Sequence, residues 1–453
     1  MTDQLMGDRT AASPPAPGQL EREKPYFGPG TEADVPFAVL YQGEYETLGD
    51  GTAMAVRRHA RALAATGIPV KLLSFSGTYV NAQGVRQPAH LGIPDAVERE
   101  VGALRHTSAT TLTPQIKHAV VTSAEQLRNL LTPRGAIWVG GDMLQTVRLR
   151  RDICRRTILY TVWERDGIDA EMASEMSRCG ELWVPCEQNR SMLIASGVHA
   201  HKIVVVPHPY DPDDALNKLL RRKPDPSWRL FYSIGRWEPR KAYAELIEAF
   251  LRAFTPDDQV LLTIKYSGGG HWENYPTPTE ALERALALPE VASKWSAEQA
   301  LQRVRLAGQH VSRDGILELH FYNNLYVSCS HGEAFNFGAF EAKQAGNRMV
   351  YTTFGGVRDY AASDDVDIPT LEVEPVPESY RWGGARWGAV RVPELMAALR
   401  RAEAPTEYRQ PECLASYRSD RIGALMRERV LALLDREAVH EPAEFYRAHK
   451  EQP

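Results

Sequence analysis

The stretch 325–346 constrains the fold of this chain more than any other. It begins with an apolar run, residues 325–329, whose β-branched and aromatic side chains favour a buried strand. A turn at His331-Gly332 follows, and then an Ala- and Phe-rich segment that favours a helix beginning near Phe337. Parallel α/β sheets bind their ligands where strands pass into helices, so the stretch predicts such a sheet with a ligand site at its edge.

Two carboxylates flank this turn, Glu333 before the expected helix and Glu341 within it. A carboxylate accepts two hydrogen bonds in a fork, which suits the neighbouring hydroxyls of a hexose or a ribose. Backbone N–H groups and the positive helix end lie between the two acids and suit an anion. The pattern therefore predicts a nucleotide-sugar, in which two polyols flank a diphosphate. The alternative is a pair of solvated acids on a helix surface.

A second element carries two cations at the end of one strand. The apolar residues 230–234 predict the strand, which leads into Gly235-Arg236, and Lys241 follows just before a helix expected over 242–254. Two cations placed there would neutralise the charge that builds on a departing diphosphate. Ordinary surface salt bridges are the alternative.

Glu333-x7-Glu341 followed by Ala345-Gly346, together with the Gly-Arg…Lys element, resembles the signature of retaining glycosyltransferases with the GT-B fold. These enzymes form the large bacterial family called glycosyl transferases group 1, of the family-four type. The resemblance implies an α/β fold with two Rossmann-like domains, whose parallel sheets face each other across a cleft. It also implies hexosyl transfer from a UDP- or GDP-linked sugar with retention at the anomeric carbon, and neither a metal nor another cofactor.

The resemblance assigns roles to individual residues. Glu333 would face the donor sugar and act in catalysis with Arg236 and Lys241, which would hold the diphosphate, while Glu341 would bind the ribose. The family commonly has glycine, glycine and proline at the first, third and fifth positions after the first glutamate, and this chain departs from that pattern, so the donor sugar stays open. The full set of implied donor-binding residues is Gly235, Arg236, Lys241, Arg305, Glu333, Ala334, Phe335, Asn336, Phe337, Gly338 and Glu341.

The first half of the chain begins with a βαβ pattern: a strand at 37–41, a loop with Gly49 and Gly51, a helix at 52–64 and a strand at 70–75. In the family such a loop approaches the donor phosphates and the acceptor; the alternative is a plain tight turn. A later strand at 157–162 ends in Trp163-Glu164, which resembles a pair that faces the cleft in bacterial members. Glu164 is therefore a candidate acceptor-site residue, with a surface loop acid as the alternative.

The length of 453 residues accommodates two domains of ordinary size. We expect a disordered leader over 1–34, an acceptor domain over 35–211, a donor domain over 228–400 and, over 401–453, helices that return to the first domain. The five cysteines form no C-x-x-C pair, so neither a disulfide framework nor a zinc site is indicated. Without a transmembrane run or a signal-peptide pattern, a cytoplasmic protein is expected.

The acceptor stays open at this stage: a saccharide, a lipid-linked glycan, a natural product, a protein or a modified nucleic-acid base. A net charge of −5 argues against a generally basic nucleic-acid binder without excluding a local patch. Arginines at 148–156 and on the helix 52–64 fit either solvated helix faces or an anionic acceptor or peripheral membrane contact. Alternatives to transfer are a GT-B phosphorylase, a sugar-nucleotide epimerase or a non-catalytic nucleotide-sugar-binding protein.

Overall fold

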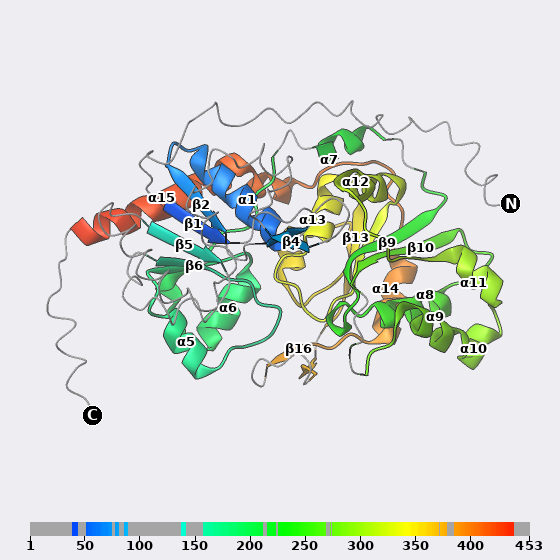
Figure 1. Ribbon diagram of the computed structural model, residues 1–453. Coiled ribbons are helices and arrows are strands. Elements are labelled where there is room, and N and C mark those ends of the chain that lie inside the picture. The colour runs from blue at the N-terminus through cyan, green and yellow to red at the C-terminus, as the bar shows by residue number, and fades with distance from the viewer. Residues whose placement is uncertain are drawn as a thin grey trace.

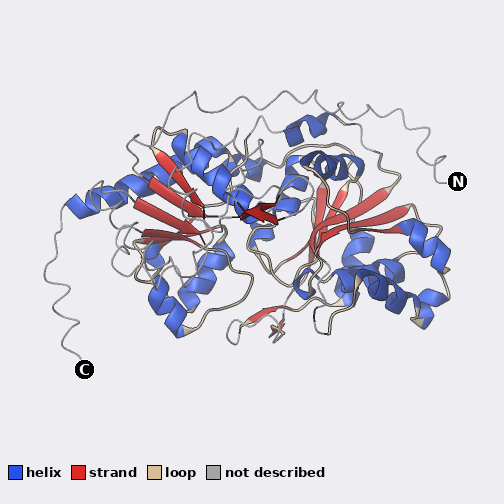
Figure 2. Cartoon of the chain, in the orientation of Figure 1, coloured by secondary structure: helices blue, strands red, loops and turns tan. Residues whose placement is uncertain are grey.

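The computed structural model describes residues 39–43, 51–74, 78–80, 86–88, 137–141, 157–211, 215–222, 225–268, 272, 274–370, 372–377 and 385–438. These residues form two parallel sheets that lie side by side, each with helices on both faces (Figures 1 and 2). The predicted leader, Gly49 and the arginine run at 148–156 lie outside the described residues.

The first sheet has the strand order β2-β1-β5-β6-β7-β8, with every neighbouring pair parallel. Helix α1 (Gly51–Ala64) joins its first two strands in sequence, as the βαβ pattern predicts. The strands are β1 (Val39–Gly43), β2 (Val70–Ser74), β5 (Ile137–Gly141), β6 (Thr157–Tyr160), β7 (Glu181–Val184) and β8 (Ile203–Val205), and the other helices are α5 (Ala170–Met176), α6 (Glu187–Ala195) and the 3-10 turn η6 (Ala200–Lys202).

The second sheet has the order β11-β10-β9-β12-β13-β14, again with parallel neighbours. Because β9 lies between β10 and β12, the carboxyl ends of β9 and β12 are adjacent, and these ends carry the two predicted motifs. The strands are β9 (Arg229–Arg236), β10 (Val260–Ser267), β11 (Val304–Ala307), β12 (Leu325–Ser328), β13 (Arg348–Thr352) and β14 (Val366–Ile368).

The helices of the second sheet cover both of its faces (Figure 1). One face carries α8 (Tyr243–Ala253), α9 (Pro278–Leu286) and α14 (Val392–Arg401), and the other carries α12 (Arg313–Tyr322) and α13 (Phe337–Gln344). The remaining elements near this sheet are α7 (Ala215–Lys218), α10 (Pro289–Ala292), α11 (Ala297–Arg303) and the 3-10 turns η7 (Leu219–Arg221), η8 (Pro239–Lys241), η9 (Gly356–Tyr360) and η11 (Glu412–Tyr417).

Helix α15 (Ser419–Ala438) follows the second sheet in sequence but packs against α1 of the first. Its apolar side chains repeat at helical spacing and enter the core beneath the first sheet, where they meet Val56 and Leu63 of α1. The α15 side chains in that core are Ile422, Met426, Val430 and Leu433. The last described helix therefore ties the end of the chain to its first sheet.

Two short antiparallel pairs complete the described fold. They are β3 (Thr78–Val80) with β4 (Arg86–Pro88), and β15 (Val373–Pro375) with β16 (Arg386–Gly388). The β15–β16 pair lies between β14 and α14 in the chain. None of the helices in the described part of the chain is long and apolar enough to cross a membrane.

Candidate functional site

The start of α13 is fixed by its capping residue, Asn336. The helix begins at Phe337, as predicted, and the Asn336 side chain accepts a hydrogen bond of 3.1 Å from the Ala339 N–H. Asn336 has a φ of 65°, in the left-handed region that asparagine tolerates better than most residues. Its amide also donates to the Ser328 hydroxyl at 3.0 Å, which ties the helix to the end of β12.

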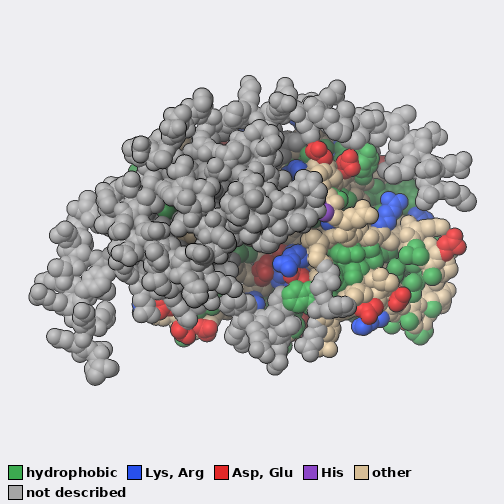
Figure 3. Space-filling model, viewed as in Figure 1, with side chains coloured by type: hydrophobic (Ala, Val, Ile, Leu, Met, Phe, Trp, Pro, Cys, Tyr) green, Lys and Arg blue, Asp and Glu red, His purple; other side chains and the backbone are tan. Residues whose placement is uncertain are grey.

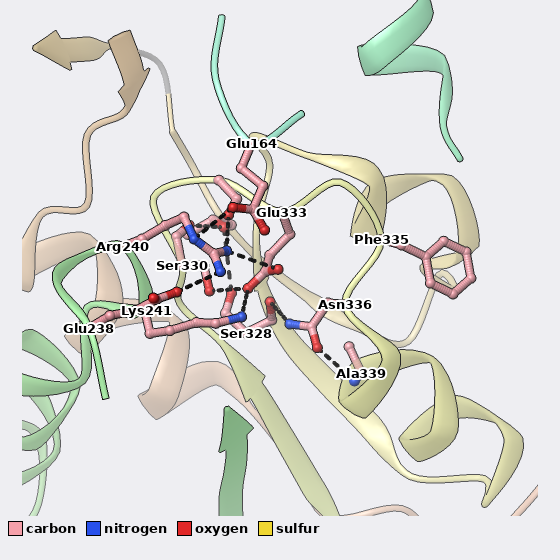
Figure 4. Close-up of polar contacts among 12 residues, drawn as sticks. Glu164, Glu238, Arg240, Lys241, Ser328, Ser330, Glu333, Phe335, Asn336 and Ala339 are labelled. Carbon is pink, nitrogen blue, oxygen red and sulfur yellow. Dashed lines mark hydrogen bonds and ion pairs between the residues drawn. The ribbon is translucent and has the colours of Figure 1, made fainter. Parts of the chain in front are cut away.

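The turn between β12 and α13 places Glu333 inside a cluster of charged and polar groups (Figure 4). One Glu333 oxygen pairs with the Lys241 ammonium and accepts a 2.6 Å hydrogen bond from the Ser330 hydroxyl, and the other lies 3.2 Å from Arg240. Burial alone would raise the pKa of Glu333, but the charges of Lys241 and Arg240 outweigh it and hold the pKa below its usual range. The carboxylate is therefore ionised at neutral pH.

Lys241 reaches this cluster from the end of β9. The 3-10 turn η8 carries it, and Ala242, with a φ of 52°, joins that turn to α8. A side chain at Gly235 would bring its Cβ within 2.5 Å of the Tyr243 hydroxyl and 3.2 Å of Lys241 Cε, so the close approach requires glycine here. Arg236 is exposed at the strand end, and its side chain forms no hydrogen bond or ion pair with the residues that the structure describes.

Arg240 is a member of the cluster that the sequence analysis missed. Its guanidinium is buried and contacts Glu164 at 2.9 Å, Glu238 at 2.6 Å and the Gly332 carbonyl at 2.8 Å, besides Glu333. The Pro-Arg-Lys run shows two neighbouring basic residues, but the sequence does not indicate that both would turn towards the same carboxylate.

The second glutamate, Glu341, lies in a separate cluster that also spans the two sheets' domains. It pairs with Arg313 at 2.8 Å and with Arg58 of α1 at 3.3 Å, and His320 lies 3.6 Å away. Burial lowers the pKa of His320, so this ring is neutral at pH 7. Burial alone would raise the pKa of Glu341, but Arg313, the nearby His320 ring and Arg58 together lower it. Arg58, Arg313 and His320 were not among the predicted site residues.

The residues between the two glutamates pack closely against neighbouring side chains and backbone. Phe335 is buried among aromatic rings and points away from the Glu333 cluster, and its carbonyl accepts a 2.5 Å hydrogen bond from Tyr360 (Figure 4). Phe337 stacks on His208 of the first domain with ring centroids 4.6 Å apart. A Cβ on Gly338 would lie 2.5 Å from the Tyr326 hydroxyl. Ala334 is buried, and its carbonyl would be 2.1 Å from a Cβ on Gly356.

Comparison with known proteins identifies the fold. Neither a protein-family model nor a curated protein matches the chain. Among solved structures, the galactosyltransferase WaaB of the lipopolysaccharide outer core shares 13% identity over 87% of this chain and 99% of its own, with a TM-score of 0.55. The α,α-trehalose 6-phosphate synthase of Burkholderia multivorans shares 12% over 90% and 99%, with a TM-score of 0.55. The Anabaena protein Alr3699/HepE in complex with UDP shares 13% over 89% and 98%, with a TM-score of 0.50.

The chain has the GT-B fold. The predicted class, two Rossmann-like domains with parallel sheets that face each other, is therefore confirmed. At identities of 12–13% such matches establish the fold alone, so what the site can do depends on the side chains of this chain.

The loop that follows β6 makes further contacts between the two GT-B domains. The Trp163 backbone is held by Asn189, which accepts at 2.9 Å and donates at 2.7 Å. Glu164, 37% exposed, pairs with Arg240 of the second domain, and Asp166 accepts two 2.8 Å hydrogen bonds from Arg386 of β16. Acidic and basic side chains lie close together near the middle of the face shown in Figure 3.

Two further predicted site residues, Gly51 and Arg305, lie in different parts of the structure. Gly51 is the first residue of α1, and a Cβ there would lie 3.2 Å from the Phe337 ring, so this end of α1 lies against the start of α13. Arg305 is exposed on the edge strand β11 and has no side-chain partner among the described residues. Its donor-binding role stays a prediction.

A cavity of about 620 Å³ lies beside the Glu333 cluster in the second GT-B domain. Pro239 and His331, which line it, are two residues from Lys241 and Glu333 respectively. The His331 ring stacks on Trp387 with ring centroids 4.7 Å apart, and its Nδ1 forms a 2.8 Å hydrogen bond with the Gly388 carbonyl. Within the described residues, no group of three or more His, Cys, Asp or Glu side chains is arranged to hold a metal ion.

Proposed function

We propose that this protein is a retaining glycosyltransferase that moves a hexose from a UDP- or GDP-linked donor to the hydroxyl of an acceptor. The observation that carries the proposal is the ionised, buried Glu333 paired with Lys241 at the adjacent carboxyl ends of β9 and β12. This is the edge of a parallel α/β sheet at which ligands bind. The fold adds support, because structures that share it include sugar transferases and a protein that binds UDP.

The chemistry follows from the charges at this edge. Lys241 and the exposed Arg236 would hold the donor diphosphate, and their charge would stabilise the negative charge that develops on it as the bond to the anomeric carbon breaks. The acceptor hydroxyl would attack that carbon from the face that the diphosphate leaves. Its proton would pass to the departing phosphate oxygen, so the new glycosidic bond keeps the original configuration. No protein metal ligand enters these steps.

Glu333 is suited to orienting the sugar. Ordinary retaining glycosidases use a carboxylate nucleophile about 5 Å from a second, acid–base carboxyl group. Glu333 instead accepts hydrogen bonds from Lys241 and Ser330 and forms an ion pair with Arg240, which makes it a weak nucleophile. A carboxylate held in this way can still accept a hydrogen bond from a sugar hydroxyl through its remaining lone pairs.

The test incubates the protein with UDP-glucose, UDP-galactose, UDP-N-acetylglucosamine or GDP-mannose. For each donor it measures the increase in Tm and the release of nucleoside diphosphate. Glu333→Ala and Lys241→Ala are expected to lower turnover about 100-fold or more. Lys294→Ala is the matched control, because Lys294 is an exposed lysine that contacts the Arg252 carbonyl. The anomeric configuration of the product is read by proton NMR.

The same assay separates transfer from its alternatives. With isotopically labelled donor, a sugar phosphate formed from inorganic phosphate would reveal a phosphorylase, and an altered nucleotide-sugar would reveal an epimerase. Binding of a donor without any product over a broad acceptor panel would contradict the proposal and indicate a binding protein. An inverted product would contradict the retaining mechanism alone.

A further inference from the structure

We infer that the first domain completes the donor site through a relay of three side chains, Glu164–Arg240–Glu333, so that domain closure sets the orientation of Glu333. Glu164 and Arg240 are then positioning residues, because they act through Glu333. This inference rests on the proposed function and adds to it a coupling between the two domains.

Arg240 can serve as the link because all three nitrogens of its guanidinium are engaged. Nε pairs with Glu164, Nη2 with Glu238, and Nη1 contacts both Glu333 and the Gly332 carbonyl. A guanidinium is planar and presents its donors in a fixed fork, so moving one of these contacts moves the others. Arg240 is only 9% exposed and has little room to adjust independently.

Among the described members of this cluster, Glu164 alone comes from the first domain. Its backbone also approaches the turn before Glu333, since a Cβ on Gly332 would lie 2.1 Å from the Glu164 carbonyl oxygen. One closing movement therefore brings Glu164 against both the Arg240 side chain and the backbone that carries Glu333.

The two oxygens of Glu333 are fixed by different groups. Lys241 and Ser330 hold Oε1 from within the second domain, whereas Arg240 holds Oε2. When Glu164 pairs with Nε of Arg240, it holds the guanidinium from the side of the first domain and keeps Nη1 in contact with Glu333. Separation of the domains removes this anchor, so Arg240 loses its Nε partner and keeps only the contacts with Glu238, the Gly332 carbonyl and Glu333, and its hold on Oε2 becomes less rigid.

Closure also changes the charge of the cluster. Within the second domain the carboxylates of Glu238 and Glu333 are balanced by the cations of Arg240 and Lys241. Glu164 adds a carboxyl group whose pKa is raised by burial, against the lowering effect of Arg240. Closure therefore alters the charge balance around Glu333.

The same loop supplies a matched control. Asp166 also bridges to the second domain, through two 2.8 Å hydrogen bonds from Arg386, but none of its recorded contacts reaches the Glu333 cluster. Glu164→Gln and Asp166→Asn each remove one charge of a domain-bridging pair and keep the side-chain shape. Only the first interrupts the relay.

The kinetic test compares these two variants with the wild type on whichever donor the panel identifies. Glu164→Gln is expected to lower kcat about 10- to 100-fold with less than a threefold change in donor KM, because a small misplacement of a positioned group costs rate rather than binding. Asp166→Asn is expected to change kcat less than threefold. Arg240→Lys, which keeps the charge but loses the fork, is expected to behave like Glu164→Gln. Equal effects of the two loop variants, or full activity of Arg240→Lys, would overturn the relay.

A second readout does not depend on turnover. Shifts of Tm for Glu164→Gln and Glu333→Gln are expected to be non-additive in the double variant, because both act on Arg240, whereas those for Asp166→Asn and Glu333→Gln are expected to add. Additive shifts in the first pair would contradict the relay even if no donor were turned over. Wild-type protein that turns over no nucleotide-sugar would contradict the proposed function instead, so the two failures are distinguishable.

Discussion

Replacing Lys241 by methionine removes one cation from Glu333 while keeping most of the side-chain volume. Both side chains are largely buried, at 11% and 5% exposure, and breaking a buried pair typically costs about 3–5 kcal/mol. Glu333 keeps Arg240 at 3.2 Å, a contact worth about 5 kcal/mol of attraction at an effective dielectric constant near 20, and the Ser330 hydroxyl at 2.6 Å. We therefore expect Lys241→Met to lower the free energy of unfolding by about 3 kcal/mol, the lower end of that range.

The loss of unfolding free energy in Lys241→Met is expected to depend on pH. The pKa of Glu333 is lowered in the folded protein, so its contribution to stability is fully present above the unfolded value of about 4.3 and is lost as the pH falls towards the folded value. Lys241→Met raises that folded pKa and removes most of this contribution. The difference between wild type and variant is expected to be largest near pH 7 and to shrink steadily below pH 4.

Urea unfolding followed by tryptophan fluorescence measures the difference, and about 3 kcal/mol corresponds to a Tm lower by about 6–12 °C. A double-mutant cycle with Glu333→Gln isolates the pair, and we expect a coupling energy of about 2–3 kcal/mol at pH 7. A coupling below about 0.5 kcal/mol, or a difference that does not change between pH 7 and pH 3, would refute the reasoning.

Three other changes test the site and its supports. Lys343→Met leaves the Asp365 carboxylate, 0% exposed, without its 2.8 Å partner, and urea unfolding is expected to show a loss of about 3–5 kcal/mol in the free energy of unfolding. This loss is expected to be smaller at pH 5 than at pH 7, because burial raises the pKa of Asp365 and protonation removes its charge. Asn336→Ala removes a helix cap at a left-handed φ and is expected to cost about 1–3 kcal/mol, with Asn336→Gly costing less. Arg313→Ala frees Glu341 from one guanidinium, so UDP binding by calorimetry is expected to tighten several-fold; weaker binding would show that Arg313 itself contacts the nucleotide.

Most strands could be predicted because their signal is local. The apolar run 325–329 became β12 at Leu325–Ser328, and the helix expected near Phe337 begins there. Strand ends were harder to predict: the strand expected at 230–234 continues to Arg236, since β10 beside it supplies partners as far as Ser267. The β15–β16 pair was missed because its six residues carry no sustained alternation of apolar and polar side chains.

The site was predictable only where two motifs end neighbouring strands. Glu333, Glu341, Arg236 and Lys241 were expected to line a common pocket. Glu333 and Lys241 are in contact, because β9 and β12 are adjacent in the sheet, whereas Glu341 lies in a separate cluster and Arg236 is exposed. Arg58 could not be found in this way, since it lies 283 positions from Glu341 and reaches it only through the meeting of the two domains. The functional roles of these residues stay predictions for the experiments above.

The pairing of Glu341 limits how a ribose can be accommodated there. Its two oxygens already face Arg58, Arg313 and the neutral His320, so ribose hydroxyls must share or replace one of these contacts. Arg313 is 41% exposed and can move into solvent, whereas Arg58 is 14% exposed and is also held by the Pro209 carbonyl and lies over the Phe337 ring. Replacing Arg313 therefore costs less than replacing Arg58. Because Arg58 comes from the first domain, a ribose bound in this way leaves the domain contact at Glu341 intact, and donor binding is compatible with the closed arrangement that the Glu164 contact requires.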